Sequence, residues 1–172
     1  MIEKEFVSEL LNLNINITEE QLKQLNKYFE LLVTWNEKIN LTAITKKEDV
    51  YLKHFYDSLT LNKIVNLNEI DSLCDIGTGA GFPGMVIKIL FPNIKITLVD
   101  ALNKRINFLN TVIDELNLKD ITAIHARIEE YGIKNRSKYD IVTARAVTSL
   151  PVLLEYAIPL VKVNGYFIQM KA

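Results

Sequence analysis

The stretch from Ser72 to Gly84, SLCDIGTGAGFPG, constrains this chain most. A short apolar run that carries one acid, Asp75, breaks into glycines at every second position, and an apolar run follows Gly84. Glycine allows positive φ angles and lets a ligand approach bare backbone. The stretch therefore predicts a strand, a tight turn and a helix, with which α/β folds bind nucleotide-like ligands at the carboxyl end of a sheet.

The length, composition and net charge of the chain exclude several classes of protein. Its 172 residues suggest one domain with a small appendage, and 49% hydrophobic residues are enough for a sizeable core. The net charge of −1 gives no general attraction for nucleic acid, so such a partner needs a local basic patch. One cysteine and two histidines argue against disulfides and a structural zinc site, and we expect no metal. No apolar run is long enough to span a membrane, so we expect a cytoplasmic protein. We also expect it to be a monomer.

The first 66 residues predict helices and no strand. Thr18 and Gln21 fit a capping box ahead of an amphipathic stripe, and Thr45 and Glu48 repeat this pattern ahead of a third helix. We therefore expect a helical cap at residues 1–66 and a cofactor-binding sheet domain at residues 67–172.

From residue 72 onward, strand-like runs alternate with helical patterns. The expected strands are Leu73–Ile76, Ile94–Val99, Ile121–Ala126, Tyr139–Thr143 and Tyr166–Met170. The expected helices are Gly84–Phe91, Lys104–Leu116, a short piece near Glu129, and Leu150–Val161 with Ser149 as its cap. This alternation predicts an α/β fold with a parallel sheet and helices on both faces. The chain ends directly on the last expected strand, so we expect the final strands of the sheet to lie beyond Ala172.

Two cofactors fit the glycine turn. Gly79, Gly81 and Gly84 match the dinucleotide spacing GxGxxG, which binds a pyrophosphate through backbone amides. The alternative is the DxGxGxG turn of methyltransferases that use S-adenosylmethionine (SAM), a cofactor with a cationic sulfonium and an ammonium group. Asp75 favours SAM, because a carboxylate there would repel a pyrophosphate. Asp100 ends the second strand and suits the ribose hydroxyls of either cofactor.

Several blocks of sequence together resemble one family. These blocks are WNEKINLTAI at 35–44, HFYDSL at 54–59, DIGTGAGFPG at 75–84, VDALNKRINFL at 99–109, ARIEE at 126–130 and DIVTARAV at 140–147. They resemble the RsmG (GidB) family of bacterial methyltransferases, which form 7-methylguanosine in the 530 loop of 16S rRNA. The resemblance runs from roughly residue 20 to the end of the chain. It implies a Rossmann-like methyltransferase sheet, SAM as the cofactor, and 16S rRNA or the small ribosomal subunit as the partner.

The resemblance also implies which residues hold SAM. The implied contacts are Gly77, Phe82, Ile128, Glu129 and Arg145, while Asp75, Gly79 and Asp100 line the same pocket. For Glu129 the alternative is a solvated helix start. For Arg145, which we expect to position the reactants, the alternative is a surface ion pair.

Methyl transfer to guanine N7 needs no general base, because N7 carries an in-plane lone pair and no proton. Catalysis then comes mostly from orientation and desolvation. Cys74 lies inside the first expected strand, where we expect a buried structural residue rather than a nucleophile.

Other polar residues have several possible roles. Lys134, Arg136 and Lys138 fall in one loop that we expect on the substrate side, where they either contact RNA phosphates or are simply solvated. His54 faces the active site or, as we favour, makes a local hydrogen bond, and His125 is expected to be structural. We expect Asn40 and Thr42 to cap helix ends, with contact to the substrate as the second possibility.

Two other functions remain open from the sequence. An NAD(P)-dependent oxidoreductase fits the glycine spacing but not Asp75. A ribosome-assembly factor that binds SAM or RNA without turnover fits the same blocks.

Overall fold

The computed structural model describes residues 1–145 and 147–171. In these residues, five parallel strands form one sheet in the order β3-β2-β1-β4-β5. The strands are β1 (Ser72–Ile76), β2 (Lys95–Asp100), β3 (Ile121–His125), β4 (Tyr139–Arg145) and β5 (Val161–Met170). The helices between them are α5 (Gly84–Leu90), α6 (Asn103–Glu115), α7 (Ile128–Lys134), α8 (Leu150–Ala157) and the 3-10 turn η4 (Ile158–Leu160). The α/β fold expected from the sequence is confirmed.

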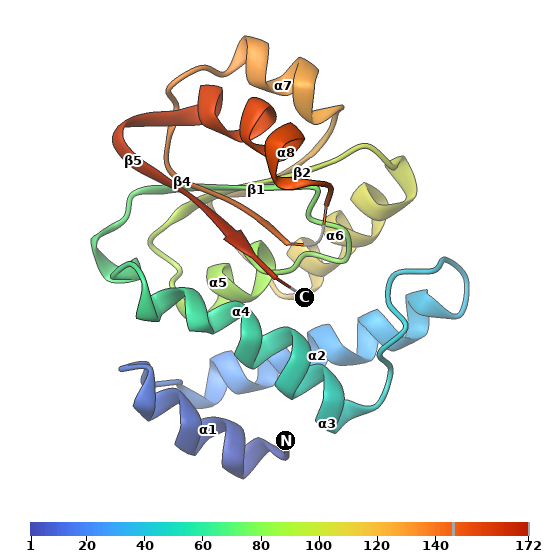
Figure 1. The fold of residues 1–172 in the computed structure, drawn as a ribbon. Helices are drawn as coiled ribbons and strands as arrows, with labels where there is room; N and C mark the ends of the chain where they lie inside the picture. The colour runs from blue at the N-terminus through green and yellow to red at the C-terminus, as the bar shows by residue number, and fades with distance from the viewer. Residues whose placement is uncertain (146, 172) are drawn as a thin grey trace.

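Helices cover both faces of the sheet (Figure 1). Successive residues of a strand point to opposite faces, and β1 shows this clearly. Leu73 packs with the core shared by the N-terminal helices, α5 and α6, whereas Cys74 and Ile76 pack with the core under α7 and α8. Cys74 is fully buried, and burial raises the pKa of its thiol, which agrees with the structural role expected for it.

The N-terminal segment is helical and lies on the α5 and α6 side of the sheet (Figure 1). Its elements are α1 (Glu3–Asn12), α2 (Glu19–Asn36), α3 (Lys47–Val50), the π-helix η1 (Tyr51–Tyr56), α4 (Asp57–Leu59), and the 3-10 turns η2 (Thr60–Lys63) and η3 (Leu67–Glu69). The expected boundary at residue 66 falls between η2 and η3, and the division into domains stays a prediction. No helix in the described parts of the chain could cross a membrane.

The two predicted capping boxes had different outcomes. Thr18 and Gln21 form theirs: the Gln21 N–H donates to Thr18 Oγ1 at 3.1 Å, and the Thr18 N–H donates to Gln21 Oε1 at 2.9 Å. The second box, at Thr45 and Glu48, was wrong. Lys46 is the N-cap of α3 without a side-chain bond, so Thr45 lies one residue outside the capping position.

The last helix is shorter than expected and the last strand longer. α8 ends at Ala157, four residues before the expected end at Val161, and η4 follows it. Pro159 has no N–H to continue the helical bonding, which accounts for the tighter turn. Ser149 is the N-cap, as expected, although its side chain makes no capping bond. β5 then begins at Val161 instead of Tyr166.

Candidate active site at the carboxyl edge of the sheet

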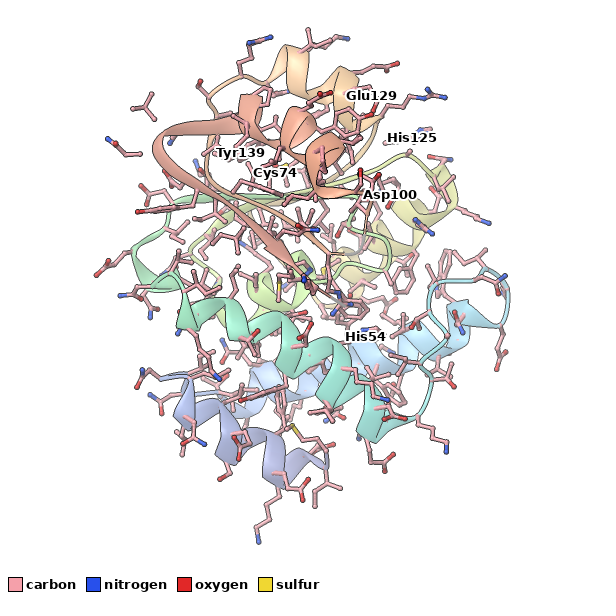
Figure 2. All side chains as sticks on the ribbon, viewed as in Figure 1. His54, Cys74, Asp100, His125, Glu129 and Tyr139 are labelled. Atoms are coloured by element: carbon pink, nitrogen blue, oxygen red, sulfur yellow. The ribbon has the colours of Figure 1, made fainter. Side chains whose placement is uncertain are left out.

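Because all five strands are parallel, their carboxyl ends meet at one edge of the sheet. The glycine loop leaves β1 at this edge, Asp100 ends β2, and Arg145 is the last residue of β4. Glu129 lies in the first turn of α7, which follows β3. Figure 2 shows Asp100, His125 and Glu129 at this edge, and His54 on the helical segment below.

Asp75 holds the glycine loop against helix α5. Its Oδ2 accepts hydrogen bonds from the Thr78 hydroxyl and the Gly84 N–H, both at 2.8 Å. Its Oδ1 is buried and has no hydrogen-bond partner among the described residues. Burial raises the pKa of Asp75 to about 7, although the two hydrogen bonds act in the opposite direction. Asp75 therefore fixes the path of the glycine loop from inside the fold.

Gly77 and Gly79 both have left-handed backbone, with φ of 63° and 59°. A Cβ atom at Gly77 would lie 2.6 Å from Val147 Cγ2, whereas a Cβ at Gly79 would meet no atom of the described residues within 4 Å. The Gly79 N–H donates to Asp100 Oδ2 at 2.9 Å. The loop is therefore closed on one side by Val147 and leaves open space beside bare backbone next to Asp100.

Asp100 is almost fully buried at the end of β2. Its Oδ1 accepts from the Leu102 N–H at 3.0 Å, and Arg105 donates to its Oδ2 at 3.4 Å. A carboxylate has about four lone-pair sites, so it can accept ribose hydroxyls as well. The open space at Gly79 and the acceptors of Asp100 beside it suit the ribose of SAM.

Phe82 joins the loop to the helical segment. The His54 ring stacks on it with 4.3 Å between ring centroids and 12° between planes, and the Arg145 guanidinium lies 5.2 Å from its centroid. Tyr28 packs on Phe82 at 5.5 Å, and its hydroxyl donates to the Ala80 carbonyl at 2.5 Å. The glycine loop and the N-terminal helices are therefore in direct contact.

Arg145 is hydrogen-bonded to residues of η1 and α4. Its Nη1 donates to Asp57 Oδ2 at 3.1 Å and to the Lys53 carbonyl at 3.2 Å, and its Nη2 lies 2.9 Å from His54 Nδ1. Only 10% of the Arg145 side chain is exposed, so this is not the surface ion pair that was the alternative.

His54 is held in one tautomer by its neighbours. Because arginine can only donate, Nδ1 must accept, so Nε2 carries the proton and donates to Thr42 Oγ1 at 2.9 Å. Burial, reinforced by the charge of Arg145, lowers the pKa of His54 to about 4, so the ring is neutral near pH 7. Of the two roles that the sequence offered His54, the structure shows the hydrogen bond, to Thr42, and the place facing the active site stays a prediction. Thr42 bonds His54, and no helix-capping bond of Thr42 is seen within the described ranges.

A pocket of about 420 Å³ opens between η1, α4 and the end of β4. We call it the cap pocket. It is lined by Ile44, Leu52, Lys53, His54, Tyr56, Asp57, Thr60 and Arg145. It combines apolar walls with one carboxylate and one guanidinium.

Ile128 and Glu129 lie where the sequence predicted, at the start of α7 beside the ends of β2 and β3. The Ala126 N–H donates to the Asp100 carbonyl at 3.1 Å, which joins this turn to Asp100. The Glu129 side chain is exposed, and Arg127, at 4.0 Å, is its only ion-pair partner among the described residues. His125 bonds the Ala101 carbonyl at 3.0 Å, which agrees with the structural role expected for it.

Lys134, Arg136 and Lys138 do not join this site. They lie at the end of α7 and just before the first residue of β4. In a parallel sheet this is the amino edge, opposite the glycine loop, so their expected place on the substrate side was wrong. All three side chains are exposed. Their contact with RNA stays a prediction.

Sequence reasoning missed the contacts of Tyr28 and Asp57. Asp57 follows His54 by three residues, a spacing that puts both on one helix face and signals a shared role. Nothing local distinguishes Tyr28 from the other apolar and aromatic residues of its helix.

The comparisons with known proteins agree with this geometry. The family model described as GidB, rRNA small subunit methyltransferase G, matches residues 21–172. Ribosomal RNA small subunit methyltransferase G of Lysinibacillus sphaericus is 52% identical over 174 residues, which cover 100% of this chain and 73% of that protein. The Bacillus subtilis protein of the same name is 51% identical, over 98% of this chain and 72% of its own length.

Solved structures show the same fold at low sequence identity. A SAM-dependent methyltransferase from Aquifex aeolicus is similar with a TM-score of 0.55 and 18% identity, over 80% of this chain and 71% of that one. Precorrin-6y C5,15-methyltransferase from Geobacter metallireducens is similar with a TM-score of 0.56 and 18% identity, over 76% of this chain and 64% of that one. The fold and the sequence agree, and the chain belongs to the rRNA small subunit methyltransferase G family.

Proposed function

We propose that this protein transfers a methyl group from SAM to N7 of a guanine in the 530 loop of 16S rRNA. Membership of the family supports methylation of small-subunit rRNA. The choice of guanine N7 rests on the resemblance and on the chemistry of the site. The observation that carries the proposal is the contact of Phe82 with His54 and Arg145. Phe82 belongs to the glycine loop, which Asp75 fixes, and His54 and Arg145 line the cap pocket.

SAM is the cofactor, and it supplies an electrophilic methyl group on a sulfonium. We propose that Asp100 binds the ribose hydroxyls and that Gly77 and Gly79 allow the cofactor to approach the backbone. Ile128 and Glu129 are our candidates for the adenine side. Phe82 and Arg145 then lie between cofactor and substrate.

The geometry of Asp75 argues against NAD(P). A dinucleotide turn leaves the first amides of its helix free for a pyrophosphate. Here the Gly84 N–H at the start of α5 already donates to the Asp75 carboxylate. A second anion at this position would meet like charge.

The residues around the cap pocket suit an acceptor that needs no deprotonation. Both ring nitrogens of His54 are engaged, and its pKa is lowered to about 4, so it is a poor general base. Cys74 is buried in β1 away from the pocket. Guanine N7 reacts directly through its lone pair, so positioning by Arg145 and exclusion of water are enough.

We further propose that Lys134, Arg136 and Lys138 contact rRNA phosphates outside the target loop. Their position at the amino edge suits contacts that orient a large RNA and carry no sequence information.

Calorimetric titration with S-adenosylhomocysteine, with NADH in parallel, tests the cofactor. We expect micromolar binding of the first and none of the second. NADH binding alone would overturn the proposal in favour of an oxidoreductase. Labelled methyl transfer to 16S rRNA from a strain lacking this modification then tests turnover. Binding without turnover would favour the assembly factor.

A further inference from the structure

We propose that Asp57 reads the Watson–Crick edge of the target guanine in the cap pocket. This inference rests on the proposed function and names the residue that selects guanine. The pocket volume of about 420 Å³ lies within the ~300–1,000 Å³ typical of small-ligand sites. Its lining combines the apolar side chains of Ile44 and Leu52 with the ring of Tyr56, which suits an unstacked base.

Asp57 is the only carboxylate among the described lining residues. Its Oδ2 accepts from Arg145 Nη1 at 3.1 Å, and no described residue donates to its Oδ1. The side chain is 36% exposed, so this second oxygen can meet a ligand. Arg145 is in turn fixed by the Lys53 carbonyl and His54, so the carboxylate is held in place before the base arrives.

The reaction decides which edge of the base can be read. Methylation at N7 requires the Hoogsteen edge, with N7 and O6, to face the methyl donor. Recognition must then use the Watson–Crick edge, where guanine presents the N1–H and N2–H donors. A carboxylate only accepts hydrogen bonds, so it matches guanine and repels the N1 lone pair of adenine.

Arg145 is poorly placed to read the base itself. Both hydrogens of its Nη1 are directed to Asp57 and the Lys53 carbonyl, and Nη2 is engaged by His54. Three of its five N–H donors are therefore already used inside the protein, which leaves fewer of them to read guanine O6 and N7. Arg145 positions Asp57, and Asp57 contacts the base.

Nucleotide binding, followed by NMR with S-adenosylhomocysteine present, tests this directly. GMP, IMP and AMP differ at the edge in question: IMP lacks the N2 amino group, and AMP carries an acceptor at N1. The wild-type protein should bind GMP best and AMP worst. In Asp57→Asn, GMP affinity should fall roughly tenfold and the preference should disappear.

Glu48→Gln is the matched control, because it removes one carboxylate charge from an exposed position on α3 outside the pocket. It should keep the wild-type order. Unchanged affinity for S-adenosylhomocysteine shows that each variant is folded. Equal binding of GMP, IMP and AMP by the wild type would overturn the inference. This outcome is decided by the wild-type protein alone, so it does not depend on whether a variant folds. A preference that survives Asp57→Asn would overturn it too.

A second measurement separates this inference from the proposed function. 16S rRNA is assembled with guanine or inosine at the methylated position, and kcat/KM is compared. Inosine should slow the wild type by roughly tenfold and Asp57→Asn not at all. A wild type that prefers GMP but methylates no rRNA contradicts the proposed function alone. A wild type that methylates guanine and inosine equally contradicts the role of Asp57 alone.

Discussion

Asp75 shows how one residue serves both fold and site. Its Oδ2 ties Thr78 and the start of α5 together, and this fixes the path of the glycine loop. Its Oδ1 stays buried without a partner among the described residues, which is costly for a charged carboxylate. The carboxylate that fixes the glycine loop therefore also lowers the stability of the folded protein when it is charged.

The raised pKa of Asp75 predicts a pH dependence of stability. Its pKa is about 7 in the folded protein against an ordinary value of 3.8, so the folded state binds more protons between these values. The free energy of unfolding should then fall as pH rises from about 4 to about 7. In Asp75→Asn the amide oxygen can keep both hydrogen bonds, so this fall should be absent.

Urea unfolding of both proteins without cofactor, at several pH values from 5 to 8, measures this difference. Asp75→Asn should gain stability over the wild type as pH rises, by an amount on the order of a few kcal/mol across the window. His54 titrates in both proteins, so the comparison isolates Asp75. A difference that stays constant with pH would contradict the account.

Gly77→Ala should damage the loop. The new Cβ would lie 2.6 Å from Val147 Cγ2 at a φ of 63°. Left-handed backbone alone costs about 1–2 kcal/mol for a residue with a side chain. We expect a lower melting temperature and at least tenfold weaker binding of S-adenosylhomocysteine by calorimetry.

Gly132→Ala is the control for this change. Gly132 lies in α7, and among the described residues a Cβ there would meet only the Tyr156 carbonyl, at 3.4 Å. Alanine is the better helix former by about 1 kcal/mol, so stability should hold or rise. Equal effects of the two substitutions would show that the Gly77 contact is unimportant.

At the scale of elements, η1 and the start of α4 supply most of the residues that line the cap pocket. The π-helix η1 carries His54 and the Lys53 carbonyl, and α4 begins with Asp57. All three meet Arg145 at the end of β4. π-helical turns are rare and frequently lie at functional sites, and this one sets the edge of the cap pocket.

Arg145→Lys should loosen this junction although it keeps the charge. A lysine cannot reproduce the planar fork that joins Asp57, His54 and the Lys53 carbonyl. Leaving a buried polar partner unpaired costs about 1–3 kcal/mol, so unfolding in urea should shift by that amount and kcat should fall. Arg127→Lys, at a side chain that is 71% exposed, should leave stability unchanged. If Arg145→Lys left stability and kcat unchanged, this would contradict the claim that the hydrogen bonds of Arg145 stabilise the site.

The sequence predicts those features that neighbouring residues determine, and it does not predict contacts between distant residues. The strand, glycine turn and helix around Gly77, and the acid at Asp100, are set by neighbouring residues, and they were found. The contacts of Arg145 with η1 join positions about 90 residues apart, and spacing alone cannot show them. The basic loop at Lys134 was placed on the wrong edge because only the parallel topology decides which end of β4 it reaches.

At the scale of the whole molecule, the helical segment and the sheet share one core. Residues from α1, α2 and η1 pack in the same cluster as α5, α6 and one face of the sheet. Phe82 lies in this cluster and also touches His54 and Arg145. The cofactor loop and the cap pocket are therefore parts of one packed unit rather than two separate sites.

The basic loop offers a test of how far the RNA footprint extends. Removing one interaction with a phosphate should reduce the slope of log affinity against log salt by about 0.7–0.9. Changing Lys134, Arg136 and Lys138 together to glutamine should lower rRNA affinity and flatten this slope. Binding of S-adenosylhomocysteine should not change. An unaltered salt slope would show that the loop is only solvated.

The most direct test of the central claim is to find where the methyl group goes. Purified protein is incubated with SAM and unmethylated 16S rRNA, and N7-methylguanine is mapped by strand scission after borohydride and aniline treatment. We predict one cleavage site, at a guanine in the 530 loop, that depends on both protein and SAM. A methyl group found on another atom or another base, or no transfer by a protein that binds S-adenosylhomocysteine, would contradict the account.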